Sequence, residues 1–288
     1  MKLELFCYAL ATAFLGVAAG GCSSTANPYP DVATFCSEKA KAICEASAIC
    51  AVDPNACQSS QVIACQNGAN AATASGTRKY NSGAAGACIN AVRSAFGGGS
   101  SKVTYSQLVG AGSITDQCER VFSGGAPVGQ SCASDYDCSG SLICAPVLPG
   151  SPSRVCAGAS SVNQGDFCAS PGQVCQTSYC AIQDSGAAQC APLATAGQTC
   201  SASIPCVSGQ RCLSGICQAA VGPAQPCTTS VDCASNDPYC DPYAGNICTL
   251  GLTFATGAAD CSGFLLGEGA NVGVAGGSDA GGDAPAGD

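Results

Sequence analysis

Apolar residues follow a helical period in the first third of the chain. Over residues 32–49 they recur at steps of three and four positions, the spacing of one face of an α-helix. The charged residues mostly lie between these positions: Glu38, Lys39, Lys41 and Glu45. The pattern predicts a first helix with one buried face and one polar face.

Capping residues set the boundaries of two further helices. Asp53 followed by Pro54 is an N-cap with proline at the first helical position, so a second helix should begin there. Residues 67–68 (Asn-Gly) offer this helix a left-handed stop. Apolar residues on one side of residues 84–96, with Gly97 after them, predict a third helix.

Four cysteines carry a register between the first two helices. The positions of Cys36 and Cys65 add to the same total as those of Cys44 and Cys57, and residues that face each other in an antiparallel hairpin share such a constant sum. We therefore predict the disulfides Cys36–Cys65 and Cys44–Cys57, with the bend of the hairpin near Cys50. A segment this small and rich in alanine buries little apolar area, so such bridges suit it.

After Gly125 the helical period stops and a cysteine period begins. Four units of four cysteines follow one another, separated by turn residues such as Gly, Pro, Ser, Asp and Asn. Their cysteines are Cys132, Cys138, Cys144 and Cys156 (unit one); Cys168, Cys175, Cys180 and Cys190 (unit two); Cys200, Cys206, Cys212 and Cys217 (unit three); and Cys227, Cys233, Cys240 and Cys248 (unit four). We expect short two-stranded ribbons and turns, with units stacked end to end.

Three disulfide connectivities are open within each unit. We favour the pairing of the first cysteine with the third and of the second with the fourth, because crossed bridges make the chain more compact than bridges between adjacent cysteines would. In unit one these pairs are Cys132–Cys144 and Cys138–Cys156. Cys50, Cys88, Cys118 and Cys261 stay without assigned partners, and Cys261 resembles the opening of a fifth unit that stops.

The chain starts with a pattern typical of export. An apolar run over residues 5–19, too short to span a bilayer as a mature helix, ends in small residues before Cys22. This arrangement resembles the lipobox of bacterial lipoproteins and implies lipidation of Cys22, a membrane partner through the lipid anchor, and an outer-membrane or cell-surface location. The alternative is cleavage at a small-residue site that leaves Cys22 a free thiol.

These patterns together predict a small disulfide-rich protein. Its expected parts are a signal peptide (1–21), a tether (22–34), a disulfide-stapled α-helical domain (35–122), the tandem cysteine repeats (127–261) and a disordered Gly/Ala/Asp tail (262–288). The helical domain comes first, and the repeats follow with short β-ribbons and turns.

Composition narrows the chemistry. The 26 cysteines indicate an exported scaffold, and the absence of Cys-x-x-Cys pairs argues against a metal or redox site. Histidine is absent, which excludes a Ser-His-Asp triad and an imidazole metal ligand. A net charge of −9 makes nucleic acid a poor partner. We expect neither a catalytic residue nor a cofactor.

Acidic side chains are the remaining candidates for chemistry. Asp135, Asp137, Asp232, Asp237 and Asp241 could contribute to a calcium site or, less readily, to acid–base catalysis. Turn and cap hydrogen bonds are the alternative role of aspartate in such loops, and we favour it.

Two units carry a resemblance to a known family. The segments GQSCASDYDCSGSLIC and GQTCSASIPCVSGQRC are similar to the Gly-x-x-Cys, x5, Cys-x-x-Gly-x-x-Cys pattern of the Dickkopf N-terminal type cysteine-rich region. Tandem copies behind a helical segment and a lipobox resemble predicted bacterial lipoproteins of unknown activity. Unit two departs in its spacing and unit four lacks the inner glycine.

We expect a non-enzymatic, surface-anchored adhesion, binding or display module whose partner is an unknown protein or glycan. The alternatives are a protease inhibitor that uses a disulfide-held loop over residues 147–154, and a calcium- or carbohydrate-binding module.

Overall fold

The computed structural model describes residues 27–254 and 259–266. The predicted signal peptide, Cys22 and residues 267–288 of the predicted tail lie outside these ranges. Within them the protein is disulfide-rich, with an N-terminal helical domain and short strands in small sheets.

Three main helices build the helical domain. α1 (Val32–Ile43) continues into a 3₁₀ turn, η1 (Cys44–Ala46), and α2 (Pro54–Thr73) begins where the Asp53 carboxylate accepts hydrogen bonds from the backbone of residues 55 and 56. α3 (Ser82–Phe96) follows. The predicted stop at residues 67–68 is wrong, because α2 runs through Gly68, which is buried against the rest of the domain.

Short elements complete the domain. β1 (Arg78–Tyr80) pairs antiparallel with β3 (Phe122–Gly124), and β2 (Lys102–Thr104), α4 (Tyr105–Leu108) and α5 (Ile114–Glu119) lie between them in the sequence. The core is aromatic at this end: Phe35 packs against Tyr80 and Phe122, with ring centroids 6.1 and 6.2 Å away.

Disulfides hold the helices together. The structure joins Cys36 to Cys65 and Cys44 to Cys57, the two pairs that the constant sum predicts. Cys88 and Cys118 form a further bridge between α3 and α5.

The four cysteine units, which we call the array, consist of small two-stranded ribbons and 3₁₀ turns. The ribbons are β4 (Ile143–Pro146) with β5 (Arg154–Ala157), β8 (Ser178–Ile182) with β9 (Ala188–Pro192), β10 (Gln210–Leu213) with β11 (Ile216–Ala219), and β12 (Tyr239–Asp241) with β13 (Ile247–Thr249). β6 (Ser160–Val162) pairs in parallel with β7 (Gln173–Cys175). The 3₁₀ turns are η2 (Asp135–Asp137), η3 (Ser230–Asp232) and η4 (Pro242–Ala244).

One backbone plan repeats in all four units. All have the crossed connectivity, first cysteine to third and second to fourth. Three positions before the first cysteine the chain turns with a positive φ, and the residue there donates its N–H to the carbonyl of the fourth cysteine. That residue is Gly129, Gly165 or Gly197 in the first three units and Ala224, with φ 57°, in unit four.

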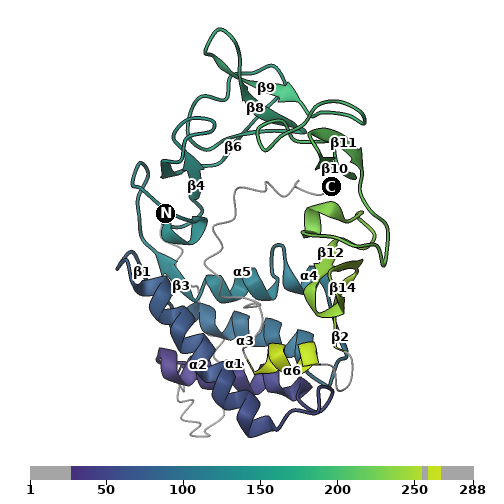
Figure 1. The fold of residues 1–288 in the computed structure, drawn as a ribbon. Helices are drawn as coiled ribbons and strands as arrows, with labels where there is room; N and C mark the ends of the chain where they lie inside the picture. Colours follow the sequence, from purple (N-terminus) through teal and green to yellow (C-terminus); the bar gives the residue numbers. More distant parts are fainter. Residues whose placement is uncertain (1–26, 255–258, 267–288) are drawn as a thin grey trace, which may run out of the picture.

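The array is fastened to the helical domain at both ends, so the chain forms an arch (Figure 1). The chain leaves the helical domain after β3 and returns to it at β14 (Gly251–Thr253), which pairs with β2. α6 (Ala259–Leu265) then packs beside α2, where the Gln61 amide donates to the carbonyls of Phe264 and Leu265. Instead of opening a fifth unit, Cys261 bonds to Cys50.

Unit four closes the arch through one face of its ribbon. The Tyr239 ring lies 6.4 Å from that of Tyr105 in α4, and the fully buried Asp241 carboxylate accepts the N–H of Thr253 in β14. Residues 251–254 and 259–266 thus belong with the helical domain in space.

Candidate functional site

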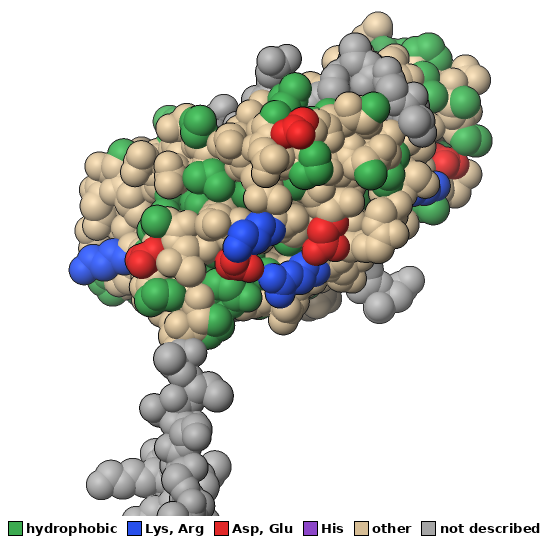
Figure 2. Space-filling model, turned by 90° about the horizontal axis from the view of Figure 1, so that it is seen from below, with side chains coloured by type: hydrophobic (Ala, Val, Ile, Leu, Met, Phe, Trp, Pro, Cys, Tyr) green, Lys and Arg blue, Asp and Glu red, His purple; other side chains and the backbone are tan. Residues whose placement is uncertain are grey.

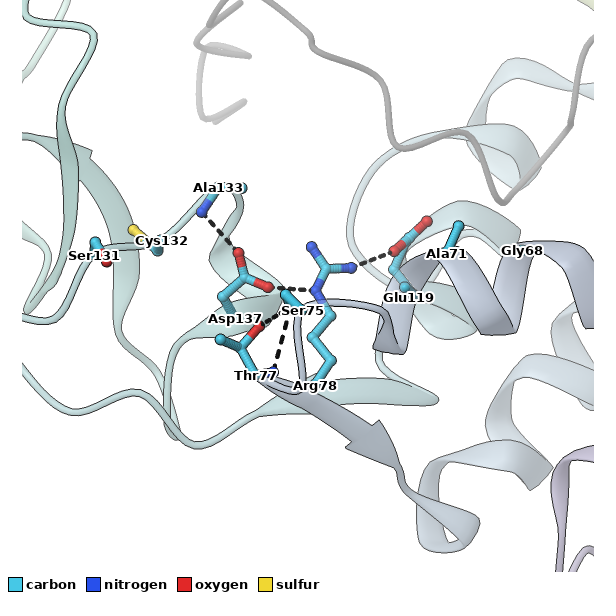
Figure 3. A pocket seen from close by; sticks show the side chains of 11 residues that line it. Gly68, Ala71, Ser75, Thr77, Arg78, Glu119, Ser131, Cys132, Ala133 and Asp137 are labelled. Atoms are coloured by element: carbon cyan, nitrogen blue, oxygen red, sulfur yellow. Dashed lines mark hydrogen bonds and ion pairs between the residues drawn. The ribbon is translucent and has the colours of Figure 1, made fainter.

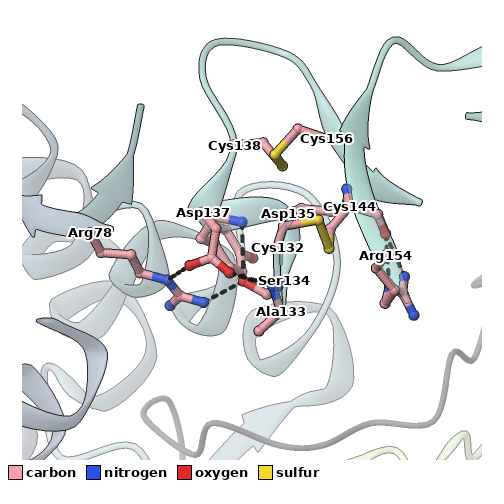
Figure 4. Close-up of a disulfide and its surroundings, with 11 residues drawn as sticks. Arg78, Cys132, Ala133, Ser134, Asp135, Asp137, Cys138, Cys144, Arg154 and Cys156 are labelled. Carbon is pink, nitrogen blue, oxygen red and sulfur yellow. Dashed lines mark hydrogen bonds and ion pairs between the residues drawn. A yellow bond between two sulfur atoms is a disulfide. The ribbon is translucent and has the colours of Figure 1, made fainter. Parts of the chain in front are cut away.

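An aspartate fastens unit one to the helical domain. One oxygen of Asp137 accepts the backbone N–H groups of Ala133 and Ser134, at 2.7 and 2.9 Å, and so caps the turn η2. Its other oxygen lies 2.5 Å from Nε of Arg78 in β1, and Arg78 also donates to the Ser134 hydroxyl (Figure 4). The same carboxylate therefore shapes the repeat and binds the helical domain; we call this arrangement the aspartate clasp.

Unit four contains the same device. Asp232 also precedes the second cysteine of its unit, caps its turn through the N–H groups of Thr228 and Thr229, and lies 3.6 Å from Arg211 of unit three. Units two and three have Val174 and Pro205 at this position, and neither side chain can bind a guanidinium group. The capping aspartate therefore occurs in the first and last units, where Asp137 binds the helical domain and Asp232 binds unit three.

The clasp of unit one borders a cavity of about 430 Å³. Arg78 lies between two carboxylates there, Asp137 on the side of the array and Glu119 of α5 on the other, at 3.3 Å (Figure 3). Small residues form the rest of the wall. The lining residues are Gly68, Ala71, Ala72, Ser75, Thr77, Arg78, Glu119, Ser131, Cys132, Ala133 and Asp137.

Burial shifts the pKa values of the charges at this junction. It lowers the pKa of Lys39 to about 8, opposed by the nearby Glu119 carboxylate, and raises the pKa of Glu119 against the attraction of Arg78 and Lys39. For Asp137 burial acts in the same upward direction, but the hydrogen bonds from Arg78, Ala133 and Ser134 outweigh it and hold the pKa below its ordinary value.

Lys39 departs from the polar face that its sequence pattern predicts. Its side chain is only 4% exposed, and within residues 27–254 and 259–266 its ammonium group makes no ion pair. The sequence also did not indicate the pairing of Arg78 with Glu119. The two residues are close in space but far apart in the sequence, so their pairing leaves no periodic pattern.

The other candidate aspartates are not brought together. Asp135 accepts the N–H of Cys144 at 2.6 Å, Asp241 accepts those of Tyr243 and Thr253, and Asp237 accepts from the neighbouring side chain of residue 236. Cap and turn hydrogen bonds are therefore the roles that the structure gives to these carboxylates.

Apolar side chains are exposed on the ribbons and loops of the array. They include Leu148 (56% exposed) in the hairpin of unit one, Phe167 (62%) and Ile182 (61%) in unit two, and Leu213 (41%) in unit three. Figure 2 shows a face of the molecule on which basic and acidic side chains lie next to each other. In the helical domain, Glu38 forms ion pairs with Lys41 and Arg93.

No family model, no curated protein and no solved structure matches the chain. The disulfide content fits an exported protein. Among the described residues, no helix combines the length and the apolar character needed to cross a bilayer.

Proposed function

We propose that the protein is an exported lipoprotein, anchored through Cys22, that works as a non-enzymatic adhesion, binding or display module with a protein or glycan partner. The observation that carries the proposal is the arch. Crossed disulfides, the aspartate clasp, the pair of Asp232 with Arg211 and the return to the helical domain fix the ribbons. Apolar side chains such as Leu148 and Phe167 stay exposed in the loops beside these ribbons. A rigid support reduces the entropy lost on binding.

The chemistry of the carboxylates supports a role without turnover. Asp135, Asp137 and Asp232 accept backbone N–H groups within the array, and the chain has no histidine to move protons near neutral pH. The likeness of the units to the Dickkopf N-terminal type cysteine-rich region is in keeping with a binding module.

A pull-down from the cell envelope tests the binding role. The exported full chain is the bait, and a variant with Leu148→Ser, Phe167→Ser and Leu213→Ser is compared with a control in which the exposed Ile63 of α2 is changed to Ser. We expect a saturable partner that the triple variant loses and the control keeps. Turnover in a broad hydrolase screen that Asp135→Asn or Asp137→Asn abolishes would overturn the proposal.

The lipid anchor has its own test. Expressed in a Gram-negative host, the protein should incorporate labelled palmitate and partition into the detergent phase. Equal labelling of a Cys22→Ala protein would contradict lipidation at that residue.

Protease inhibition is a second candidate, favoured by the hairpin loop of unit one. Val147 donates to the carbonyl of Ser153 and Ser151 donates to that of Leu148, both at 2.9 Å, so the loop holds Leu148 exposed on a braced turn. Inhibition of a protease panel by the full chain, lost on Leu148→Asp, would favour this role; no inhibition at micromolar concentration would exclude it for that panel.

A further inference from the structure

The crossed disulfides bring three sulfur atoms close together in each unit, and the fourth is bonded to one of these three. In unit one the sulfur atoms of Cys132, Cys138 and Cys156 lie within 4.8 Å of one another, and the fourth, Cys144, is bonded to Cys132 (Figure 4). Equivalent groups occur in the other units: Cys168, Cys175 and Cys190; Cys200, Cys206 and Cys212; and Cys227, Cys233 and Cys248.

This spacing is close to that of a four-thiolate metal site. A tetrahedral zinc ion binds sulfur at about 2.3 Å, which places its ligand atoms about 3.8 Å apart. Three sulfur atoms of each unit already lie within 4.8 Å of one another. The fourth is bonded to one of these three, and bonded sulfur atoms would have to separate by less than 2 Å from a disulfide. The turn and hairpin of each unit therefore bring cysteine sulfur atoms into a cluster suited to a metal ion. The sequence does not indicate this cluster, because it contains no Cys-x-x-Cys pair.

We propose that each unit, once its two disulfides are reduced, binds one soft divalent cation such as Zn²⁺ through its four thiolates. The same thiols are present in a newly exported chain before it is oxidised. Because a central ion ties the same four positions as the crossed bridges, the path of the chain through the unit stays the same in both states.

The conversion is balanced as follows. A trialkylphosphine gives two electrons to each disulfide and becomes the phosphine oxide, while water supplies the oxygen atom and the two protons of the new thiols. Binding of Zn²⁺ to the four thiols releases four protons to solvent and forms four metal–sulfur bonds.

The helical domain provides an internal comparison. Its bridges, Cys36–Cys65, Cys44–Cys57, Cys88–Cys118 and Cys50–Cys261, are separate pairs, and among the described residues no third ligand atom lies in a close group with any of them. Reduction should therefore create sites in the array only. The proposal predicts four ions per chain, one for each unit.

Native mass spectrometry of the exported full chain tests this stoichiometry. The protein is reduced with a trialkylphosphine under anaerobic conditions, loaded with Zn²⁺ and freed of excess metal. Cd²⁺ loading adds a second measurement, the sulfur-to-metal absorption band. We expect four ions for the parent, three for Cys206→Ser/Cys217→Ser in unit three, and four for Cys36→Ser/Cys65→Ser in the helical domain.

Three results would overturn the proposal. They are a reduced chain that retains no metal, an equal loss of metal in the two double variants, and aggregation of the reduced chain that Zn²⁺ does not prevent, since a bound ion would hold each unit folded.

Discussion

Changing Lys39 to Met should make the helical domain more stable near neutral pH. The ammonium group is buried, and burial lowers its pKa from 10.5 to about 8. The unfolded chain therefore binds a proton more readily than the folded one, so the charge opposes folding at pH 7. A difference of about 2.5 pH units corresponds to about 3 kcal/mol, and the attraction of Glu119, which raises the Lys39 pKa, is already included in this difference.

The sign of the pH dependence follows from the same shift. Since the folded pKa is the lower one, the destabilisation is complete below about pH 8 and fades as the pH rises towards the unfolded value of 10.5. The free energy of unfolding of the parent protein should rise by about 2 kcal/mol between pH 7 and 9.5 from this residue.

Urea unfolding followed by far-ultraviolet circular dichroism, which reports the helices, measures both effects. Lys39→Met should be more stable at pH 7 and lose most of the alkaline rise. Lys41→Met is the matched control, because Lys41 lies on the same helix with its side chain 54% exposed and should change stability little. A Lys39→Met protein that is less stable than the parent at pH 7, or that keeps the full rise, would refute the reasoning.

Four further predictions concern the array. Asp137→Asn should destabilise the junction by about 2 kcal/mol in urea unfolding, because the buried Arg78 loses its nearer carboxylate and keeps only Glu119, at 3.3 Å. Asp232→Asn, with its partner at 3.6 Å, should cost about 1 kcal/mol. The pKa of Asp137 is lowered, so its contribution should be present above about pH 4 and lost as the pH falls below that value. Gly197→Ala should cost about 1 kcal/mol at a φ of 80°, whereas Ala224→Gly should change unfolding by less than about 1 kcal/mol. Limited reduction with peptide mapping should open the disulfide of the exposed Cys212 before the others in the array, and earlier loss of a buried bridge would contradict this order.

Local cysteine patterns predicted most of the covalent framework. Cys36–Cys65 and Cys44–Cys57 lie in one helical hairpin, and the crossed pairs repeat in every unit. Both sets of disulfides therefore give regular cysteine spacings in the sequence. Cys50 and Cys261 are 211 residues apart and share no such pattern. Their pairing depends on the return of the whole array, which only the three-dimensional packing determines.

The two predictions that were wrong, at Gly68 and Lys39, have a common physical cause. Gly68 was predicted to end a helix, but it is buried against the domain and α2 continues to Thr73. Lys39 lies between apolar positions, yet α2 and α3 pack against α1 and Glu119 of α5 lies near its ammonium group, so a nominally polar position is buried. Tertiary contacts override local preference at both residues.

The bridge between Cys50 and Cys261 also has a consequence for proteolysis. It closes a covalent ring that contains every peptide bond from residue 51 to residue 260, and the four units lie within it. A single cut anywhere in this ring leaves both new ends attached to the same molecule. A protease would therefore have to cleave at least twice, or act together with a reductant, before any part of the array could diffuse away.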